Sequence, residues 1–453
     1  MMRTSALAAP LLLLAAAAPA AAGPLQDAVG APEGFTLKAG LRSRSEAIDN
    51  QFRPTGPESD ALWSLRANIF AEYDFGAVRI GAQLIDTRAY FGKHNSTGWS
   101  TSEVNALELS QAYVGIDAKA AGGDLAVKAG RYVFSLGSKR LIDGEGARNT
   151  VNAFTGAIAN WKGKGGDKIT AFWSMPHIRL PEDVALIRDN AVEWDLETSD
   201  LQFWGAHLSH PLGKLGSVEL YGLGLDERDS DSRQTSNRHL FTPGARAVRA
   251  PKAGQYDWDV EAAYQFGSIR ATRSAADRRD LAVSAGFIHA EAGRTFEGGW
   301  APRVSVHYDL ATGDKRNTRT YNRFDTLYGS RRSDFGPVSL YGPVSRANLV
   351  SAGLRLDVAP SKRLDASLMV RELWLDSRTD AFASTGVRDA RGLSGSHAGR
   401  QFEGRVRYWI IPEIIRADLG AAWLDKGRFL AEAPNARNTG DTRYAYLDLI
   451  FEF

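Results

Sequence analysis

YDWDVEAAYQF, residues 256–266, alternates apolar and polar side chains from end to end. The apolar positions are Tyr256, Trp258, Val260, Ala262, Tyr264 and Phe266, and the positions between them are Asp257, Asp259, Glu261, Ala263 and Gln265. Successive side chains of a β-strand point to opposite faces of the sheet. One face of this strand therefore suits hydrocarbon and the other suits water. A tilted strand needs about 9–11 residues to cross a bilayer, which this segment supplies.

The same alternation recurs along the chain. Clear examples lie at 35–41, 63–73, 302–310, 352–358, 402–410 and 445–453. Many of these segments run to about 9–11 residues, whereas strands of soluble proteins are usually about 5–6 residues long. Aromatic residues gather towards the segment ends, as Tyr256 and Phe266 do, where the interfacial girdles of a membrane barrel belong. The pattern predicts an all-β protein, a transmembrane antiparallel up-and-down β-barrel.

The number of strands follows from the length and from the connections. Residues 23–453 give about 24 residues per strand and connection for 18 strands, and sixteen or seventeen segments alternate clearly. Even numbers are the rule, so we expect about 18 strands, with 16 as the alternative. Tight turns at Pro360-Ser361 and Pro412 alternate with longer polar stretches, which predicts short periplasmic turns and long extracellular or lumen-folded loops. We expect those loops at Asn95–Ser102, Phe134–Thr150, Ile178–Ser199, Arg228–Gly254, Thr312–Pro343 and Ser377–Arg400.

The N-terminus predicts export. Arg3 precedes an apolar stretch from Ala6 to Ala18, and Ala20-Ala21-Ala22 is a cleavage-site pattern, so residues 1–22 are expected to be a signal peptide. Residues 23–453 are expected to form one barrel domain, because no run of about 18 apolar residues and no linker divides them. The C-terminal Phe453 resembles the end that the barrel-assembly machinery recognises in bacterial outer-membrane proteins. We therefore expect a bacterial outer-membrane location, with outer-membrane lipid and lipopolysaccharide as neighbours.

Composition excludes several classes of protein. The chain has no Cys, so disulfides and thiolate metal sites are excluded. Its 55 basic and 53 acidic residues give a net charge of +2, which does not indicate nucleic acid as a partner. A mean hydropathy of −0.29 fits a wide barrel, in which only alternate wall residues face lipid.

A resemblance to a known family narrows the function. Its residues are Gly130-Arg131, Gly137-Ser138-Lys139-Arg140-Leu141-Ile142, Arg148-Asn149 and Phe154-Thr155-Gly156, with a second landmark at Arg323–Gly329 and Asp334-Phe335-Gly336. This order resembles the alginate-export family of outer-membrane porins. The resemblance implies a channel that passes an anionic uronate polymer through an arginine-lined constriction. Thr155 replaces the acidic residue of the family pattern and Asn152 a basic one, which weakens the case for alginate itself as the substrate.

Arginine is the residue type that such a channel needs. A guanidinium stays charged and grips a carboxylate with two parallel hydrogen bonds, and a lumen needs several such groups that release the solute again. The alternation points inward for Arg42, Arg44, Arg66, Arg131, Arg303, Arg355, Arg371, Arg405 and Arg407, and the loop most suited to fold inside carries Arg140, Arg148 and Asn149. Alternatively, the arginines brace the wall by pairing with Glu72, Asp257, Asp259, Glu261, Asp357 and Glu403.

The sequence predicts no catalytic or metal site. It contains no nucleophile elbow, zinc-protease motif or phosphate-binding loop. His207 and His210 would lie on opposite faces of a strand, and the acidic stretch from Asp226 to Asp229 is interpreted as a solvated loop in preference to a Ca²⁺ site. We therefore expect a passive, cofactor-free channel for anionic saccharides. A general porin without sugar preference and an outer-membrane barrel hydrolase remain the alternatives.

Overall fold

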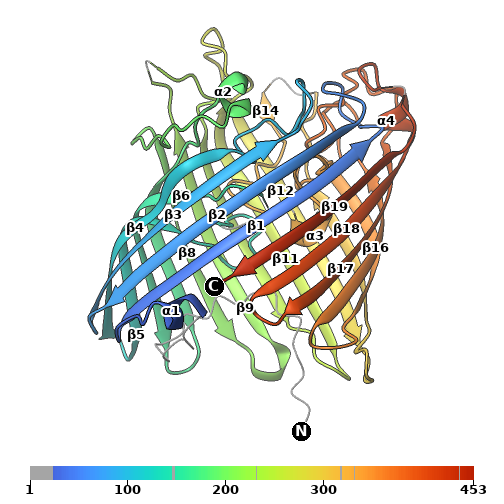
Figure 1. Ribbon diagram of the computed structural model, residues 1–453. Helices are drawn as coiled ribbons and strands as arrows, with labels where there is room; N and C mark the ends of the chain where they lie inside the picture. Colours follow the sequence, from blue (N-terminus) through green and yellow to red (C-terminus); the bar gives the residue numbers. More distant parts are fainter. Residues whose placement is uncertain (1–23, 145–147, 231, 317–318, 331, 438) are drawn as a thin grey trace.

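The chain forms a closed antiparallel β-barrel (Figure 1). The computed structural model describes residues 24–144, 148–230, 232–316, 319–330, 332–437 and 439–453. The expected signal peptide, residues 1–22, lies outside this part of the chain. Within it, the first strand β1 (Phe35–Asp49) pairs with β2 (Asp60–Asp74) on one side and with the last strand β19 (Thr442–Glu452) on the other. The pairing of β1 with β19 closes the sheet.

Eighteen strands make up the wall, as the sequence predicts, and the alternative of 16 is wrong. Besides β1, β2 and β19, they are β3 (Val78–Tyr90), β4 (Asn105–Ala120), β5 (Gly123–Val133), β6 (Ala153–Gly163), β7 (Lys168–Pro176), β8 (Leu201–Pro211), β9 (Ser217–Glu227), β10 (His239–Arg249), β11 (Tyr256–Arg270), β12 (Asp280–Thr295), β13 (Arg303–Ala311), β15 (Leu349–Val358), β16 (Leu364–Trp374), β17 (His397–Ile411) and β18 (Ile415–Lys426). The short β14 (Thr320–Tyr321) belongs to a loop and pairs in parallel with β12.

The helices are short and belong to the segments that connect or precede the wall strands. They are α1 (Pro24–Ala28), α2 (Val184–Arg188), the 3₁₀ turn η1 (Gly213–Leu215), α3 (Arg332–Phe335) and α4 (Arg428–Glu432). None of the helices in the described ranges combines the length and apolar composition of a membrane span. Figure 1 shows α1 and the C-terminus at one end of the barrel, α2 and α4 at the other, and α3 at mid-height behind the front wall.

Connections at the two ends differ in length. Eight turns of two to seven residues join strands at the end that carries α1 and the C-terminus, and nine loops of nine to 37 residues join them at the other. This is the arrangement of short periplasmic turns and long extracellular loops that the sequence predicts. One predicted loop, Arg228–Gly254, is wrong, because β10 lies inside it. The extracellular loop ends at residue 238, and residues 250–255 form a periplasmic turn.

The decisive stretch behaves as its alternation predicts. Tyr256, Val260 and Tyr264 are exposed on the outside of β11, whereas Asp257 and Glu261 are buried on the inside. An apolar outer face with a polar inner face is the pattern that a lipid bilayer requires of a barrel wall.

Buried apolar residues gather inside the barrel, where loop residues pack against the inner face of the wall. One cluster packs Phe335, Leu340, Tyr341 and neighbouring loop residues against the inner faces of β1, β2 and β17–β19. A second cluster packs Leu141, Ile142 and Phe324 against the inner faces of β5–β13. The long loops 134–152 and 312–348 therefore fold back into the lumen and fill part of it.

Candidate functional site

Loops 134–152 and 312–348 pair with each other inside the barrel. Ile142 and Tyr328 form a parallel bridge, in which the Tyr328 N–H donates to the Leu141 carbonyl and the Asp143 N–H to the Tyr328 carbonyl, both at 3.0 Å. The side-chain amide of Asn152 adds bonds to the Asp143 and Tyr328 carbonyls at 2.8 and 3.1 Å. These bonds satisfy backbone groups that would otherwise be buried unpaired. The two loops therefore form one assembly.

Loop 134–152 is fixed to the barrel wall through Asn149. The Asn149 amide, which is fully buried, donates to the carbonyls of Leu65, Glu103 and Arg88 at 2.9, 2.8 and 3.3 Å. Its oxygen accepts a bond of 3.1 Å from Arg42 of β1, and the same Arg42 nitrogen also donates to the carbonyl of Arg148. Arg42 and Asn149 thus hold the loop in position.

Arg140 crosses the lumen from the same loop and meets three carboxylates. Its guanidinium donates to Glu261 at 2.7 Å and to Asp259 at 3.0 Å on β11, and it grips Asp334 of α3 with two bonds. The carboxylates of Asp259 and Glu261 outweigh the effect of burial and raise the pKa of Arg140 further. The loop folds inside, as predicted, but the charge of Arg140 is neutralised there.

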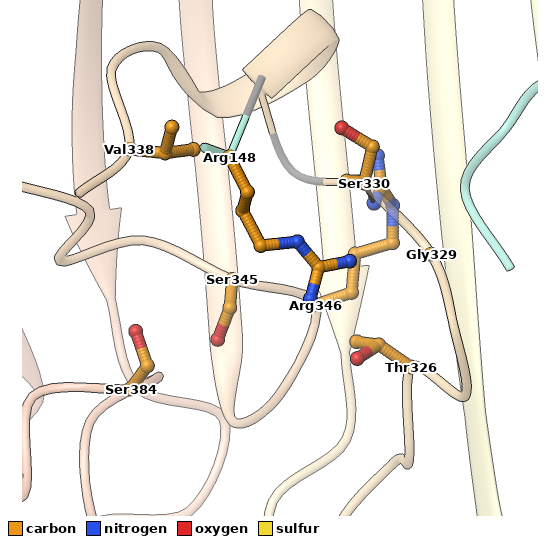
Figure 2. A pocket seen from close by; sticks show the side chains of 8 residues that line it. All are labelled: Arg148, Thr326, Gly329, Ser330, Val338, Ser345, Arg346 and Ser384. Atoms are coloured by element: carbon orange, nitrogen blue, oxygen red, sulfur yellow. Dashed lines mark hydrogen bonds between the residues drawn. The ribbon is translucent and has the colours of Figure 1, made fainter. Parts of the chain in front are cut away.

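A cavity of about 170 Å³ lies between the inward loops (Figure 2). Its lining residues are Arg148, Thr326, Gly329, Ser330, Val338, Ser345, Arg346 and Ser384. Figure 2 shows Arg148 extending through the middle of the cavity, while the Arg346 side chain runs along one side towards Ser330. Three loops, 134–152, 312–348 and 375–396, supply these residues. The arrangement places two guanidinium groups among hydroxyl groups.

The two arginines of the cavity differ in how they are held. Arg346 donates to the Ser330 carbonyl at 2.6 Å, forms an ion pair with Asp334 and lies over the ring of Phe335. Among the residues that the structure describes, none accepts a hydrogen bond from the Arg148 guanidinium. Burial lowers the pKa of Arg148, and burial together with Arg140 lowers that of Arg346 to about 9. A guanidinium group is a cation at neutral pH, so the cavity favours an anion.

The sequence predicts Arg148 at such a site but misses Arg346. Arg346 lies in a 37-residue loop, where no periodicity indicates which side chains turn inward. The only available signal was the apolar run Val338, Leu340, Tyr341 and Val344, which is unusual for a solvated loop and marks this segment as buried.

Most wall arginines brace the barrel. Arg44 grips Asp448 across the β1–β19 seam with two bonds of 2.6 Å. The remaining pairs are Arg303 with Asp257 and Glu291, Arg355 with Asp357, and Arg407 with Asp365. Arg66 lies directly opposite Arg42 in the register, Arg371 lies 4.0 Å from Asp309 and over Phe335, and Arg405 lies 4.0 Å from Asp365. Where a carboxylate offsets the charge of an arginine, as for Arg44, Arg303 and Arg407, little net attraction for a passing anion remains.

The inward direction predicted for Arg131 is wrong. Arg131 is opposite Ala112 and Thr155 in the register and alternates with Tyr132, which belongs to the inner apolar cluster. Its side chain therefore lies on the outer face of β5, near the extracellular end, where it pairs with Glu108 and with Glu197 of loop 177–200. Arg131 fastens an external loop and does not face the lumen.

One group on the inner wall has the connectivity of a hydrolase triad but not its geometry. Ser305 Oγ lies 2.9 Å from His307 Nε2, while His307 Nδ1 is 3.6 Å from Glu291, too far for a hydrogen bond. The Ser305 hydroxyl is buried and also accepts a bond of 3.1 Å from Arg303. Such a hydroxyl is not presented to a substrate.

Comparison with known proteins assigns the fold and the family. OccAB1 of Acinetobacter baumannii superposes with a TM-score of 0.58 at 10% identity, over 93% of this chain and 97% of the other. OccK2 (OpdF) of Pseudomonas aeruginosa gives a TM-score of 0.55 at 12% identity, over 92% and 98%. OccK2 in complex with glucuronate gives 0.55 at 10% identity, over 92% and 96%. No curated protein matches the sequence.

These neighbours are outer-membrane porins, and a barrel with this alternation resides in the bacterial outer membrane. The model of the alginate-export family matches residues 34–442, which is most of the chain. Family and fold together indicate an outer-membrane channel rather than an enzyme. The chain belongs to the alginate-export family.

Proposed function

We propose that the protein is a passive channel for acidic saccharides, which bind transiently at Arg148 and Arg346 on their way through the lumen. The observation that carries the proposal is the Arg148 guanidinium, which lies in the cavity with no acceptor among the described residues. A sugar carboxylate can accept hydrogen bonds from it, while the hydroxyls of Ser330, Ser345 and Ser384 match those of a sugar ring.

The small number of charged contacts at the site supports transient rather than tight binding. A hydrogen bond from a charged group contributes about 1.5–3 kcal/mol, so the loss of one guanidinium weakens binding by roughly ten- to a hundredfold. Arg346 contributes less to a solute, because Asp334 already offsets its charge. A channel needs sites of this modest strength, since a solute that binds tightly does not leave. The family and the glucuronate bound to OccK2 are consistent with a uronate-type substrate.

Planar-bilayer recordings test the proposal. Short oligouronates should block the current through the native channel, and neutral oligosaccharides of equal length should block it much less. Arg148→Gln should weaken the block by about ten- to a hundredfold. The matched control is Arg233→Gln, which removes an arginine that pairs with Glu182 in the external loops. Equal block by neutral sugars would instead establish a general porin, and an unchanged block in Arg148→Gln would exclude this site.

A further inference from the structure

Two neighbouring strands bring two histidines and a glutamate together on the inner wall. His289 and Glu291 belong to β12 and His307 to β13, and all three side chains point into the lumen. One ligand atom from each lies within 4.8 Å of those from the other two. His289 Nε2 is 3.9 Å and His307 Nδ1 3.6 Å from the same oxygen, Oε2 of Glu291. We propose that these three residues bind a divalent transition-metal ion, with Zn²⁺ as the test ion.

The fully buried His289 supplies the strongest evidence for a ligand. Its Nδ1 lies 2.7 Å from a carboxylate oxygen of Asp309, which can only accept, so the proton is on Nδ1, and in a neutral imidazole the lone pair is then on Nε2. That Nε2 is buried and has no hydrogen-bond partner among the described residues. A histidine held by a carboxylate through one nitrogen, with the other free to coordinate, is the usual arrangement of a protein metal ligand.

The other two ligands are oriented in the same way. Oε1 of Glu291 accepts a bond of 2.6 Å from Arg303, which leaves Oε2 directed at the two histidines. His307 Nε2 is 2.9 Å from the Ser305 hydroxyl, so its Nδ1 is the nitrogen that faces Glu291. Each candidate ligand therefore has a hydrogen-bond partner that fixes the orientation of its side chain. The partners are Asp309, Arg303 and Ser305. If these residues only formed salt bridges across the lumen, His289 Nε2 would not need to be left without a hydrogen-bond partner.

Ligand distances and donor types fit a metal ion. Zn²⁺ bonds of about 2.0–2.2 Å in tetrahedral geometry place neighbouring ligand atoms about 3.3–3.5 Å apart, so the separations of 3.9 and 3.6 Å from Glu291 Oε2 need only a small contraction. Two neutral histidines and a carboxylate with one open position form a common transition-metal set. Four carboxylates surround the ligands, and four guanidinium groups lie among them, so the local charge is close to balanced; the residues are Asp257, Glu291, Asp309 and Asp357, with Arg303, Arg346, Arg355 and Arg371.

Metal binding to the folded, chelator-treated barrel in detergent tests the inference. Calorimetric titration with Zn²⁺ should give one ion per chain in the native protein. His307→Gln should weaken this binding at least tenfold, and Asp309→Asn, which removes only the orienting carboxylate, by about 10–100-fold. The control is His210→Gln, which replaces an exposed histidine that lies near a periplasmic turn and pairs with Asp167; this variant should bind Zn²⁺ as the native protein does.

Spectroscopy separates this site from other sites that bind metal. The electron paramagnetic resonance spectrum of the Cu²⁺ form should show hyperfine coupling to two nitrogens in the native protein and in Asp309→Asn. In His307→Gln it should show coupling to one nitrogen. Heat-dependent gel mobility confirms in each case that the barrel is folded. Unchanged stoichiometry and affinity in the double variant His289→Ala/His307→Gln would overturn the inference, and so would the absence of binding to the native protein.

Discussion

Replacing Asp448 with Asn tests whether the wall arginines hold the barrel together. Asp448 faces Arg44 at the seam where the first and last strands meet, and the two side chains are only 3% and 1% exposed. Two bonds of 2.6 Å join them, and the Arg44 guanidinium also lies 5.3 Å from the centre of the Tyr446 ring. Breaking a buried pair from one side costs about 3–5 kcal/mol, because the remaining charge is poorly compensated.

We expect Asp448→Asn to lower the free energy of unfolding by about 3 kcal/mol, the lower end of that range, because the Asn oxygen still accepts one bond. Urea unfolding of the barrel in lipid vesicles, followed by tryptophan fluorescence, measures the change. Arg407→Gln serves as the comparison. The Arg407–Asp365 pair is about a quarter exposed, so its loss should cost less than about 1 kcal/mol.

A double-mutant cycle isolates the charge interaction. The double variant Arg44→Met/Asp448→Leu replaces both partners with apolar residues. It should regain most of the stability that either single change removes, since neither partner then leaves a buried charge. The stability of the seam does not depend on this pair in either of two cases. In the first, the effects of the two single changes on the unfolding free energy simply add in the double variant. In the second, Asp448→Asn unfolds at the same urea concentration as the native protein. The sign of the coupling energy is therefore the decisive quantity.

Three further predictions concern the loops. Burial and the carboxylate of Glu108 raise the pKa of Asp195 to about 7, whereas the unfolded residue titrates near about 4. The folded state therefore holds the proton more tightly, and the attachment of loop 177–200 should weaken as pH rises from about 4 to about 7 and change little above that. The effect is measured by proteolysis of this loop in the native protein and in Asp195→Asn, compared at each pH. A pH dependence that persists in the variant would contradict the prediction. Asn149→Ala leaves buried carbonyls unpaired and should lower the unfolding free energy by about 2–3 kcal/mol and increase current noise in bilayers, so a quiet, fully stable variant would contradict the anchoring role. Arg131→Gln should release loop 177–200 to protease without changing the block by acidic sugars, and a weakened block would return Arg131 to the lumen.

Alternation predicted the wall because the bilayer and the lumen impose opposite requirements on successive residues. The strand β10 escaped prediction for the same reason. Its outward face includes Pro243 and Ala245 and its inward face Leu240 and Val248, so polarity does not alternate clearly along it. Pro243 has no N–H to donate, and the register between β10 and β11 omits it. Where composition hides the two faces, sequence periodicity cannot find the strand.

The error at Arg131 and the omission of Arg346 have different physical causes. At Arg131 the local alternation does not distinguish the two faces of β5, and only the packing of its neighbour Tyr132 in the inner cluster identifies the inner face. Arg346 depends on how two long loops fold against each other across the lumen, which is a long-range contact with no local signature. The sequence therefore predicts the strands and the tendency of loop 134–152 to fold inward, but not the partners that neutralise Arg140 and leave Arg148 in the cavity.

The inward course of loops 134–152 and 312–348 also determines what the cell presents to its surroundings. An antibody or a bacteriophage that approaches from outside cannot reach the segments buried against the inner wall. It meets instead loop 177–200, where Val184 and Trp194 are exposed, and the hairpin tip 271–279. Substitutions that evade such binders can accumulate at these two tips while the Arg148 cavity stays unchanged.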